Sequence, residues 1–133
     1  MSDTKQWLIA TNGTQYASEA VKHAAKLYAH YPEKPAVVIL TVIEDDPLYD
    51  EARAVLEMAK YLFEDVAGSS AHVELRTEVG LPGEVISDFA ASEEVDQVFI
   101  GGADFKWDVN EGDTGGVSNY IVHKIKGTIT IIK

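Results

Sequence analysis

Five short apolar runs are spaced along the chain, and each is bounded by residues that favour turns. They cover residues 7–10, 36–43, 72–79, 98–100 and 128–133. The run at 36–43 is almost wholly apolar, which is typical of a central strand in a parallel sheet. The run at 72–79 alternates apolar and polar residues, which indicates an edge strand. The pattern therefore predicts five strands.

Between these runs, apolar residues recur at helical spacing, which predicts four helices. Thr14 is the expected N-cap of the first helix. The second is expected to have Asp46 as its N-cap and Pro47 at its first helical position, and to end at Gly68. The third is short and follows the turn at 80–83. The residues expected on the inward faces are Ala17, Ala20, Val21, Ala24, Tyr28 and Tyr31; Leu48, Ala52, Val55, Leu56, Ala59, Leu62, Phe63 and Val66; Val85, Ile86, Phe89 and Ala90; and Val117, Ile121 and Ile125.

Strands and helices alternate along the whole chain, which predicts an α/β fold. We expect a five-stranded, mostly parallel open sheet with helices on both faces, a Rossmann-like arrangement. Residues 1–133 are expected to form a single domain, because no linker or repeat interrupts the pattern. Sheets of this kind bind ligands outside the carboxyl ends of their strands, where the strand order reverses.

Composition narrows the classes of partner. The net charge of −11 argues against nucleic acid and anionic membranes, because both bind through clustered cations. No apolar run reaches the roughly 18 residues of a membrane span. The chain has no cysteine, and its first residues do not resemble a signal peptide. We therefore expect a cytoplasmic protein.

Two glycine pairs flank the loop after the fourth strand. Gly101 and Gly102 end the strand, and Gly115 and Gly116 precede the expected last helix. Strand, glycines, loop, glycines and helix is an order that brings backbone N–H groups close to an anion at a helix N-terminus. The same glycines also suit plain turns. The pattern alone leaves both interpretations open.

Five segments, taken in order, resemble those of the universal stress protein family. They are residues 10–14 (Ala-Thr-Asn-Gly-Thr), 40–44 (Leu-Thr-Val-Ile-Glu), 80–86 (Gly-Leu-Pro-Gly-Glu-Val-Ile), 96–101 (Asp-Gln-Val-Phe-Ile-Gly) and 115–121 (Gly-Gly-Val-Ser-Asn-Tyr-Ile). No single segment is diagnostic, but their order and spacing cover the whole chain. The resemblance implies a stress-response domain of the fold predicted above. The ligand-site residues that it implies are Thr11, Asn12, Gly13, Thr14, Val42, Gly102, Gly115, Gly116, Val117 and Ser118.

The phosphate-binding pattern of the ATP-binding members is incomplete in this chain. That pattern is Gly, two residues, Gly, nine residues, then Gly followed by Ser or Thr. The outer glycines fit Gly102 and Gly115, but Phe105 stands at the second glycine and Gly116 at the Ser or Thr position. Asn12 replaces the family's strand-end Asp. A phenylalanine cannot replace a glycine that lets backbone approach phosphate, so we predict that nucleotide binding is lost or weakened.

Charge in the same loop also disfavours a triphosphate. Its acidic residues, opposed by Lys106 alone, are Asp104, Asp108, Glu111 and Asp113. A bridging Mg²⁺ would invert this effect, so ATP with Mg²⁺ stays open as a cofactor. Trp107 beside Phe105 either covers a ligand or partner, or fills the space that a nucleotide would occupy.

Other clusters fit ordinary structural roles better than chemistry. The carboxylates at 44–46 suit a helix cap and solvent better than a metal. The histidines His23, His30, His72 and His123 lack the spacing of metal ligands, so no metal site is expected. Ser118 and His123 lack an orienting acid, and no catalytic residues are therefore predicted.

Three functions remain, in order of support. The first is a stress-response homodimer that engages a protein partner, with nucleotide binding lost or weakened. The alternative is an ATP- and Mg²⁺-dependent switch. An enzyme of the adenine-nucleotide alpha-hydrolase-like group has no support from the residues. The dimer is expected to form along 128–133, because this terminal apolar strand otherwise leaves an open edge, and the resemblance implies the same pairing.

Overall fold

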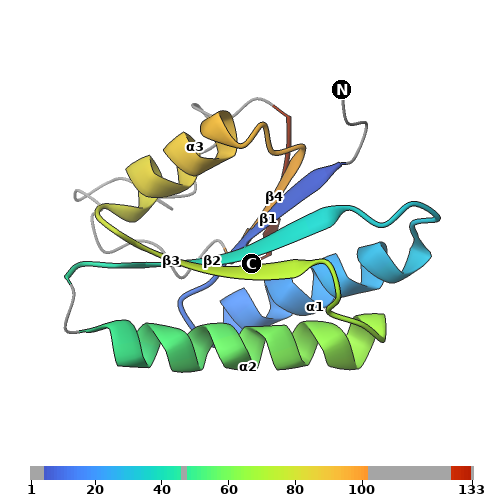
Figure 1. The fold of residues 1–133 in the computed structure, drawn as a ribbon, viewed down its shortest axis with the longest axis horizontal. Coiled ribbons are helices and arrows are strands. Elements are labelled where there is room, and N and C mark those ends of the chain that lie inside the picture. Colours follow the sequence, from blue (N-terminus) through green and yellow to red (C-terminus); the bar gives the residue numbers. More distant parts are fainter. Residues whose placement is uncertain (1–4, 46–47, 102–126, 133) are drawn as a thin grey trace.

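Strands and helices alternate in the computed structural model, which describes residues 5–45, 48–101 and 127–132 (Figure 1). The elements are β1 (Gln6–Ala10), α1 (Gln15–His30), β2 (Ala36–Ile43), α2 (Tyr49–Ala67), β3 (Val73–Val79), α3 (Pro82–Ser92), β4 (Gln97–Gly101) and β5 (Thr128–Ile132). The predicted helix around Ile121 and the final Lys133 lie outside the described residues.

The five strands form one sheet in the order β3-β2-β1-β4-β5. Every neighbouring pair is parallel, which confirms the predicted parallel sheet. β3 lies at one edge, as its alternating sequence predicts, and β5 lies at the other. The chain adds strands on one side of β1 as far as β3 and then crosses to the other side for β4. The strand order therefore reverses next to β1, where sheets of this kind bind ligands.

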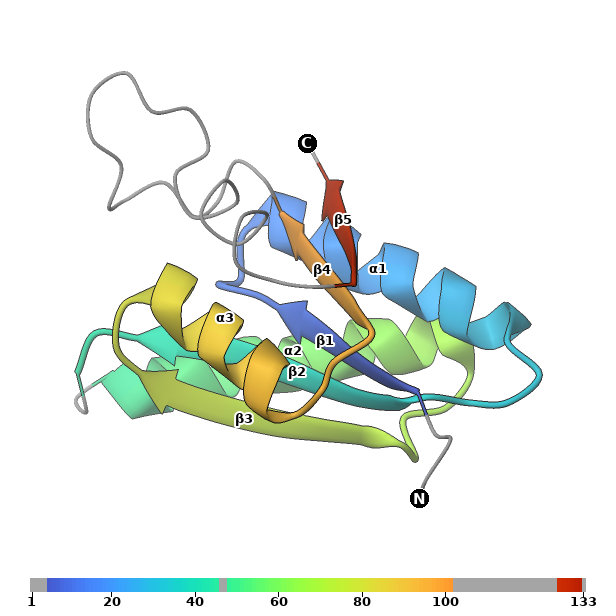
Figure 2. The ribbon, with the colours of Figure 1, turned by 90° about the horizontal axis from the view of Figure 1, so that it is seen from above.

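Helices cover both faces of the sheet, as predicted. α1 and α2 lie on one face and α3 lies on the other (Figures 1 and 2). Because side chains alternate along a strand, Trp7 and Ile9 of β1 pack toward α1 and α2, whereas Leu8 and Ala10 pack in the cluster with α3. Both sets are buried. Burial on both faces explains why every residue from Trp7 to Ala10 is apolar.

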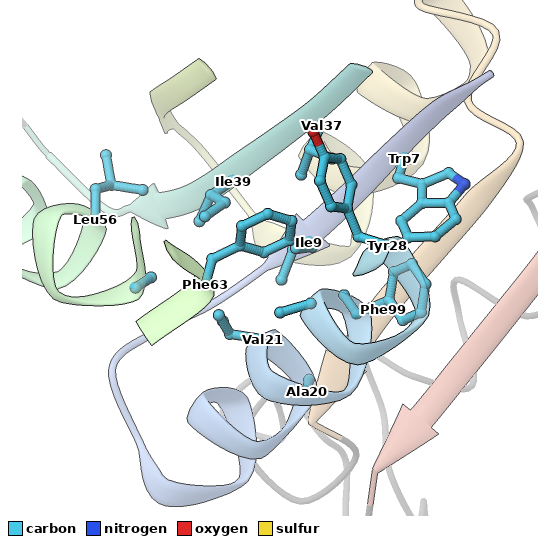
Figure 3. Packing of buried hydrophobic residues seen from close by; sticks show 13 residues of the cluster. Trp7, Ile9, Ala20, Val21, Tyr28, Val37, Ile39, Leu56, Phe63 and Phe99 are labelled. Carbon is cyan, nitrogen blue, oxygen red and sulfur yellow. The ribbon is translucent and has the colours of Figure 1, made fainter. Parts of the chain in front are cut away.

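An aromatic group fills the core beneath α1 (Figure 3). The ring centroid of Trp7 lies 5.1 Å from that of Tyr31, 5.3 Å from that of Phe99 and 6.5 Å from that of Tyr28. The contacts of Trp7 with Tyr28 and Tyr31 are edge-to-face, and such contacts add to the stabilisation from burial itself. They also hold the end of α1 against the start of β1.

The helix ends confirm two predictions and correct one. Thr14 caps α1, because its Oγ1 accepts a hydrogen bond from the Ala17 N–H. Gly68 ends α2 with φ of 87°, the left-handed conformation that glycine adopts readily. However, α2 begins at Tyr49, after Leu48, and has no side-chain cap. The prediction of Asp46 as cap and Pro47 as first helical residue is therefore wrong.

A backbone hydrogen bond precedes the start of α2. The Leu48 N–H donates to the Asp45 carbonyl oxygen over 3.2 Å, which closes a tight turn before the helix. Leu48, the N-cap residue of α2, also lines a cavity. Asp46 and Pro47 themselves lie outside the described residues. No helix in the described part of the chain is long and apolar enough to cross a membrane.

Candidate ligand site at the carboxyl edge of the sheet

The site begins with Thr11, directly after β1. Its side chain is buried, and its N–H donates to the Leu40 carbonyl oxygen of β2 over 2.9 Å. This bond continues the pairing of β1 with β2 by one residue. The backbone therefore leaves the sheet at a fixed point, beside the end of β2.

The next three residues form a turn closed by its own side chains. Thr11 Oγ1 accepts a hydrogen bond from the Gly13 N–H at 3.1 Å. Asn12 Oδ1 accepts from the N–H of Thr14 at 3.2 Å and from its hydroxyl at 2.9 Å. Local bonds of this type are usual for Asn and Thr before a helix. The N–H groups of Gly13 and Thr14 are thus already engaged within the turn.

Gly13 also sets the distance between this turn and α2. Its φ is 84°, and a Cβ built on it would lie 3.0 Å from Val55 Cγ2. Only glycine combines this backbone conformation with so close an approach at little cost. The turn after β1 consequently rests directly on α2.

A cavity of about 280 Å³ opens between the turn, the end of β2 and the first half of α2. The residues that line it are Asn12, Thr41, Val42, Ile43, Glu44, Leu48, Glu51, Ala52 and Val55. The structure therefore brings together Asn12 and Val42 from the predicted site. The volume is close to the lower end of the range for small-molecule sites.

The cavity walls are apolar and part of its lining is acidic. Ala52 is buried and Val55 is half-buried, and both come from α2. Glu44 and Glu51 line the opening with exposed carboxyl groups, and Asp45 is an exposed neighbour of Glu44. This arrangement suits an uncharged, partly apolar group and repels an anion.

Several residues of the predicted site belong to the part of the chain that the structure does not describe. Gly102, Gly115, Gly116, Val117 and Ser118 lie outside the described residues, as do Phe105, Trp107 and His123. Within the described residues, no group of three or more side chains could hold a metal ion. His23 and His30 are exposed on α1, and His72 Nδ1 lies 3.0 Å from the Tyr28 hydroxyl.

The family model of the universal stress protein family matches residues 4–133. The chain belongs to the universal stress protein family. No curated protein sequence matches it.

Solved universal stress proteins share the fold of this one. One in complex with cAMP has a TM-score of 0.77 at 19% identity, with 98% of each chain covered. Universal stress protein UspA from Lactobacillus plantarum has a TM-score of 0.76 at 16% identity, with both chains fully covered at 100%. The universal stress protein from Archaeoglobus fulgidus in complex with dAMP has a TM-score of 0.74 at 18% identity, also with 100% of each chain covered.

The α2 wall of the cavity is the part of this universal stress protein's site that the sequence does not reveal. Leu48, Ala52 and Val55 fit the apolar stripe of a helix and read as ordinary core residues. A weak indication is the Asn12-Gly13 pair, because a glycine after a strand permits close approach of another element. Which element approaches follows only from the fold.

Proposed function

We propose that this chain is a non-catalytic stress-response protein that acts as a homodimer through a protein partner. In this proposal it retains a pocket for an uncharged group but has weakened affinity for nucleotide phosphates. The observation that carries the proposal is the closed turn after β1, in which the side chains of Thr11 and Asn12 engage the N–H groups of Gly13 and Thr14.

Charge at the cavity supports the same proposal. At an effective dielectric constant of about 20, two like charges about 4 Å apart repel by about 4 kcal/mol, and by less when solvent screens them. Glu44 and Glu51 would oppose an anionic group entering the cavity in this way. The sequence of the 102–118 segment adds Phe105 and Gly116 at phosphate-binding positions.

Unequal protection of the two sheet edges supports the homodimer. Arg76 of β3 lies on the α3 side of the sheet with its guanidinium carbon 5.4 Å from the centroid of the Phe89 ring, and a charged side chain on an edge strand disfavours an added strand. β5 has the sequence Thr-Ile-Thr-Ile-Ile and carries no charge within Thr128–Ile132. It is therefore the better edge for pairing with a second copy.

Titration calorimetry with ATP and Mg²⁺, and separately with adenosine, tests the proposal. We expect ATP to bind no more tightly than adenosine, with dissociation constants above about 100 μM. Micromolar binding of ATP that requires Mg²⁺ would instead support a nucleotide-dependent switch. That second function is favoured by one observation, the base-sized cavity beside Asn12 and Val42, in a family with members solved in complex with cAMP and dAMP.

A further inference from the structure

A row of alternating charges runs along α2 beside the outer edge of the sheet. Arg53, Glu57, Lys60 and Glu64 are all exposed, and they line one hollow of about 290 Å³ together with Tyr61 and Leu75 of β3. Their spacings of four, three and four residues place them on one side of the helix. We call these four residues the α2 charge row.

The order of charges in the α2 charge row is self-complementary. Read along the helix it is positive, negative, positive, negative. If a second copy docks antiparallel, Arg53 lies opposite Glu64 of the other copy, and Glu57 lies opposite Lys60. A two-fold axis repeats both contacts, so all four charges face opposite charges. A parallel arrangement would place each charge on its like.

The edge of β3 is complementary about a two-fold axis as well. The Val37 N–H donates to the His72 carbonyl oxygen, and the Gly80 N–H donates to that of Ile43, so the even-numbered residues of β3 direct their backbone toward β2. Leu75 therefore directs its N–H and C=O outward. An antiparallel β3 pair centred on Leu75 is a hydrogen-bonded pair.

The same register matches the charges of β3. Centring on Leu75 places Glu74 of one copy opposite Arg76 of the other, twice. In the single chain Arg76 already contacts Glu74 at 3.3 Å and Glu78 at 3.0 Å. These hydrogen bonds, first to Glu78 and then to Glu74, raise the pKa of Arg76 above its ordinary value, so it stays charged. Leu75 borders the hollow of the α2 charge row, and one axis can serve both elements.

We propose that the α2 charge row and the β3 edge form a second self-association surface, which binds the same surface of another copy antiparallel. The charge of Arg76 disfavours an arbitrary added strand, but a second copy supplies Glu74 opposite it. Because β5 lies at the opposite edge of the sheet, this surface would link copies independently of any β5 pairing. All four charges of the row are exposed, so the association is weak and depends on salt.

Complementary charge variants test this surface. The acidic-row variant carries Arg53→Glu with Lys60→Glu, and the basic-row variant carries Glu57→Lys with Glu64→Lys. Each variant alone should self-associate at least about ten-fold more weakly than the parent, because like charges then face each other. An equimolar mixture should contain a heterodimer of the two at about 50 mM salt and lose it at about 500 mM. Sedimentation velocity measures the masses.

A matched pair of control variants separates the surface from general charge attraction. One control variant carries Lys5→Glu with Lys26→Glu, and the other carries Glu19→Lys with Glu33→Lys. They have the same net charges as the acidic-row and basic-row variants, but the changes are at exposed positions outside the α2 charge row. This mixture should show no heterodimer. Circular dichroism checks that every variant is folded. If the row variants fail to form the heterodimer, or if the control mixture forms it equally well, the proposed surface is wrong.

The result does not depend on β5. If β5 pairing already makes each variant a dimer, the mixture gains a species of twice that mass. If each variant alone is a monomer, the mixture gains a dimer. If each variant alone loses the salt-dependent association and still keeps a salt-resistant dimer, that result would support the α2 charge row as one surface and β5 pairing as the other.

Discussion

Gly13 and Gly68 adopt nearly the same backbone conformation in different surroundings. Their φ angles are 84° and 87°. A Cβ on Gly13 would lie 3.0 Å from Val55, whereas one on Gly68 would meet nothing within 4 Å. Comparing substitutions at the two glycines therefore separates the cost of positive φ from the cost of crowding.

Gly13→Ala should therefore destabilise the protein more than Gly68→Ala does. Strain at positive φ is expected to cost about 1 kcal/mol or more in both variants. At Gly13 the contact with Val55 adds about 1–2 kcal/mol of overpacking. Urea unfolding measures both. Equal losses in the two variants would mean that the turn moves away from α2 without cost.

Tyr28 makes stability sensitive to alkaline pH. Its side chain is buried, and burial raises the pKa of the hydroxyl above its ordinary value of 10.0. Because the folded-state pKa is the higher one, the stabilisation is complete below pH 10 and is lost as the pH rises through the folded value. Stability should fall by up to about 1.4 kcal/mol per unit of pKa difference.

The measurement is the free energy of unfolding of the parent and of Tyr28→Phe between about pH 8 and pH 11. The variant should show a smaller decline above pH 10. Tyr61→Phe is the control, because Tyr61 is 64% exposed and its loss should leave the decline unchanged. A decline of the same size in Tyr28→Phe would place its origin elsewhere.

At the scale of elements, the sequence predicts what depends on local pattern. Alternation in 72–79 identifies β3 as an edge strand, and Gly68 ends α2 as expected. The start of α2 was not predictable, because its N-cap is Leu48, an apolar residue that makes no side-chain cap hydrogen bond and so leaves no capping signal in the sequence. The cavity was predicted only in part, since Val55 enters it through contact with a turn 42 residues earlier in the chain, at Gly13.

The edge of β5 allows a selective test of the proposed homodimer. The Thr128 N–H donates to the Asp96 carbonyl oxygen on the β4 side. Since N–H directions alternate along a strand, Ile131 directs its N–H to the open edge. Ile131→Pro should remove a donor from that edge without breaking a bond to β4. If β5 pairing holds a dimer, that dimer should dissociate at least about ten-fold more readily in this variant.

Ile131→Ala is the matched control, because it shortens the same side chain and keeps the N–H. It should remain dimeric if strand pairing holds the dimer. Sedimentation equilibrium compares the two variants and the parent at micromolar concentration. A monomeric parent, or equal dissociation of both variants, would contradict pairing along β5.

For the whole molecule, the pattern of strands and helices was sufficient to predict the parallel α/β sheet. The nearly continuous apolar run in β2 requires burial on both faces, and the short runs of β1 and β4 require it too. The identity of a ligand does not follow from that pattern. It depends on how the turn after β1, the cavity and the 102–118 segment act together.

Repair of the phosphate-binding pattern tests this combined action. Phe105→Gly with Gly116→Ser should strengthen ATP binding roughly five- to a hundred-fold, through restored backbone approach and a new hydroxyl donor. Glu44→Gln should add a further gain that shrinks as salt rises, because Glu44 lines the cavity. Calorimetry on the parent, the double variant and the triple variant measures both steps. The weakened-nucleotide proposal is wrong if the parent already binds at micromolar affinity.

The strand order has a consequence for the protein during its synthesis. β1 is synthesised first, but in the folded protein it is the central strand of the sheet, between β2 and β4. β2 can pair with it early, whereas its other side has no strand until Gln97–Gly101 has been made. At about 5–20 residues per second, that side stays open for several seconds on the ribosome. Until then β1, which contains Trp7, is an apolar strand with one unpaired edge. Segments of this kind are prone to aggregation and are typical chaperone targets. We therefore expect the nascent chain to be most prone to aggregation before β4 emerges.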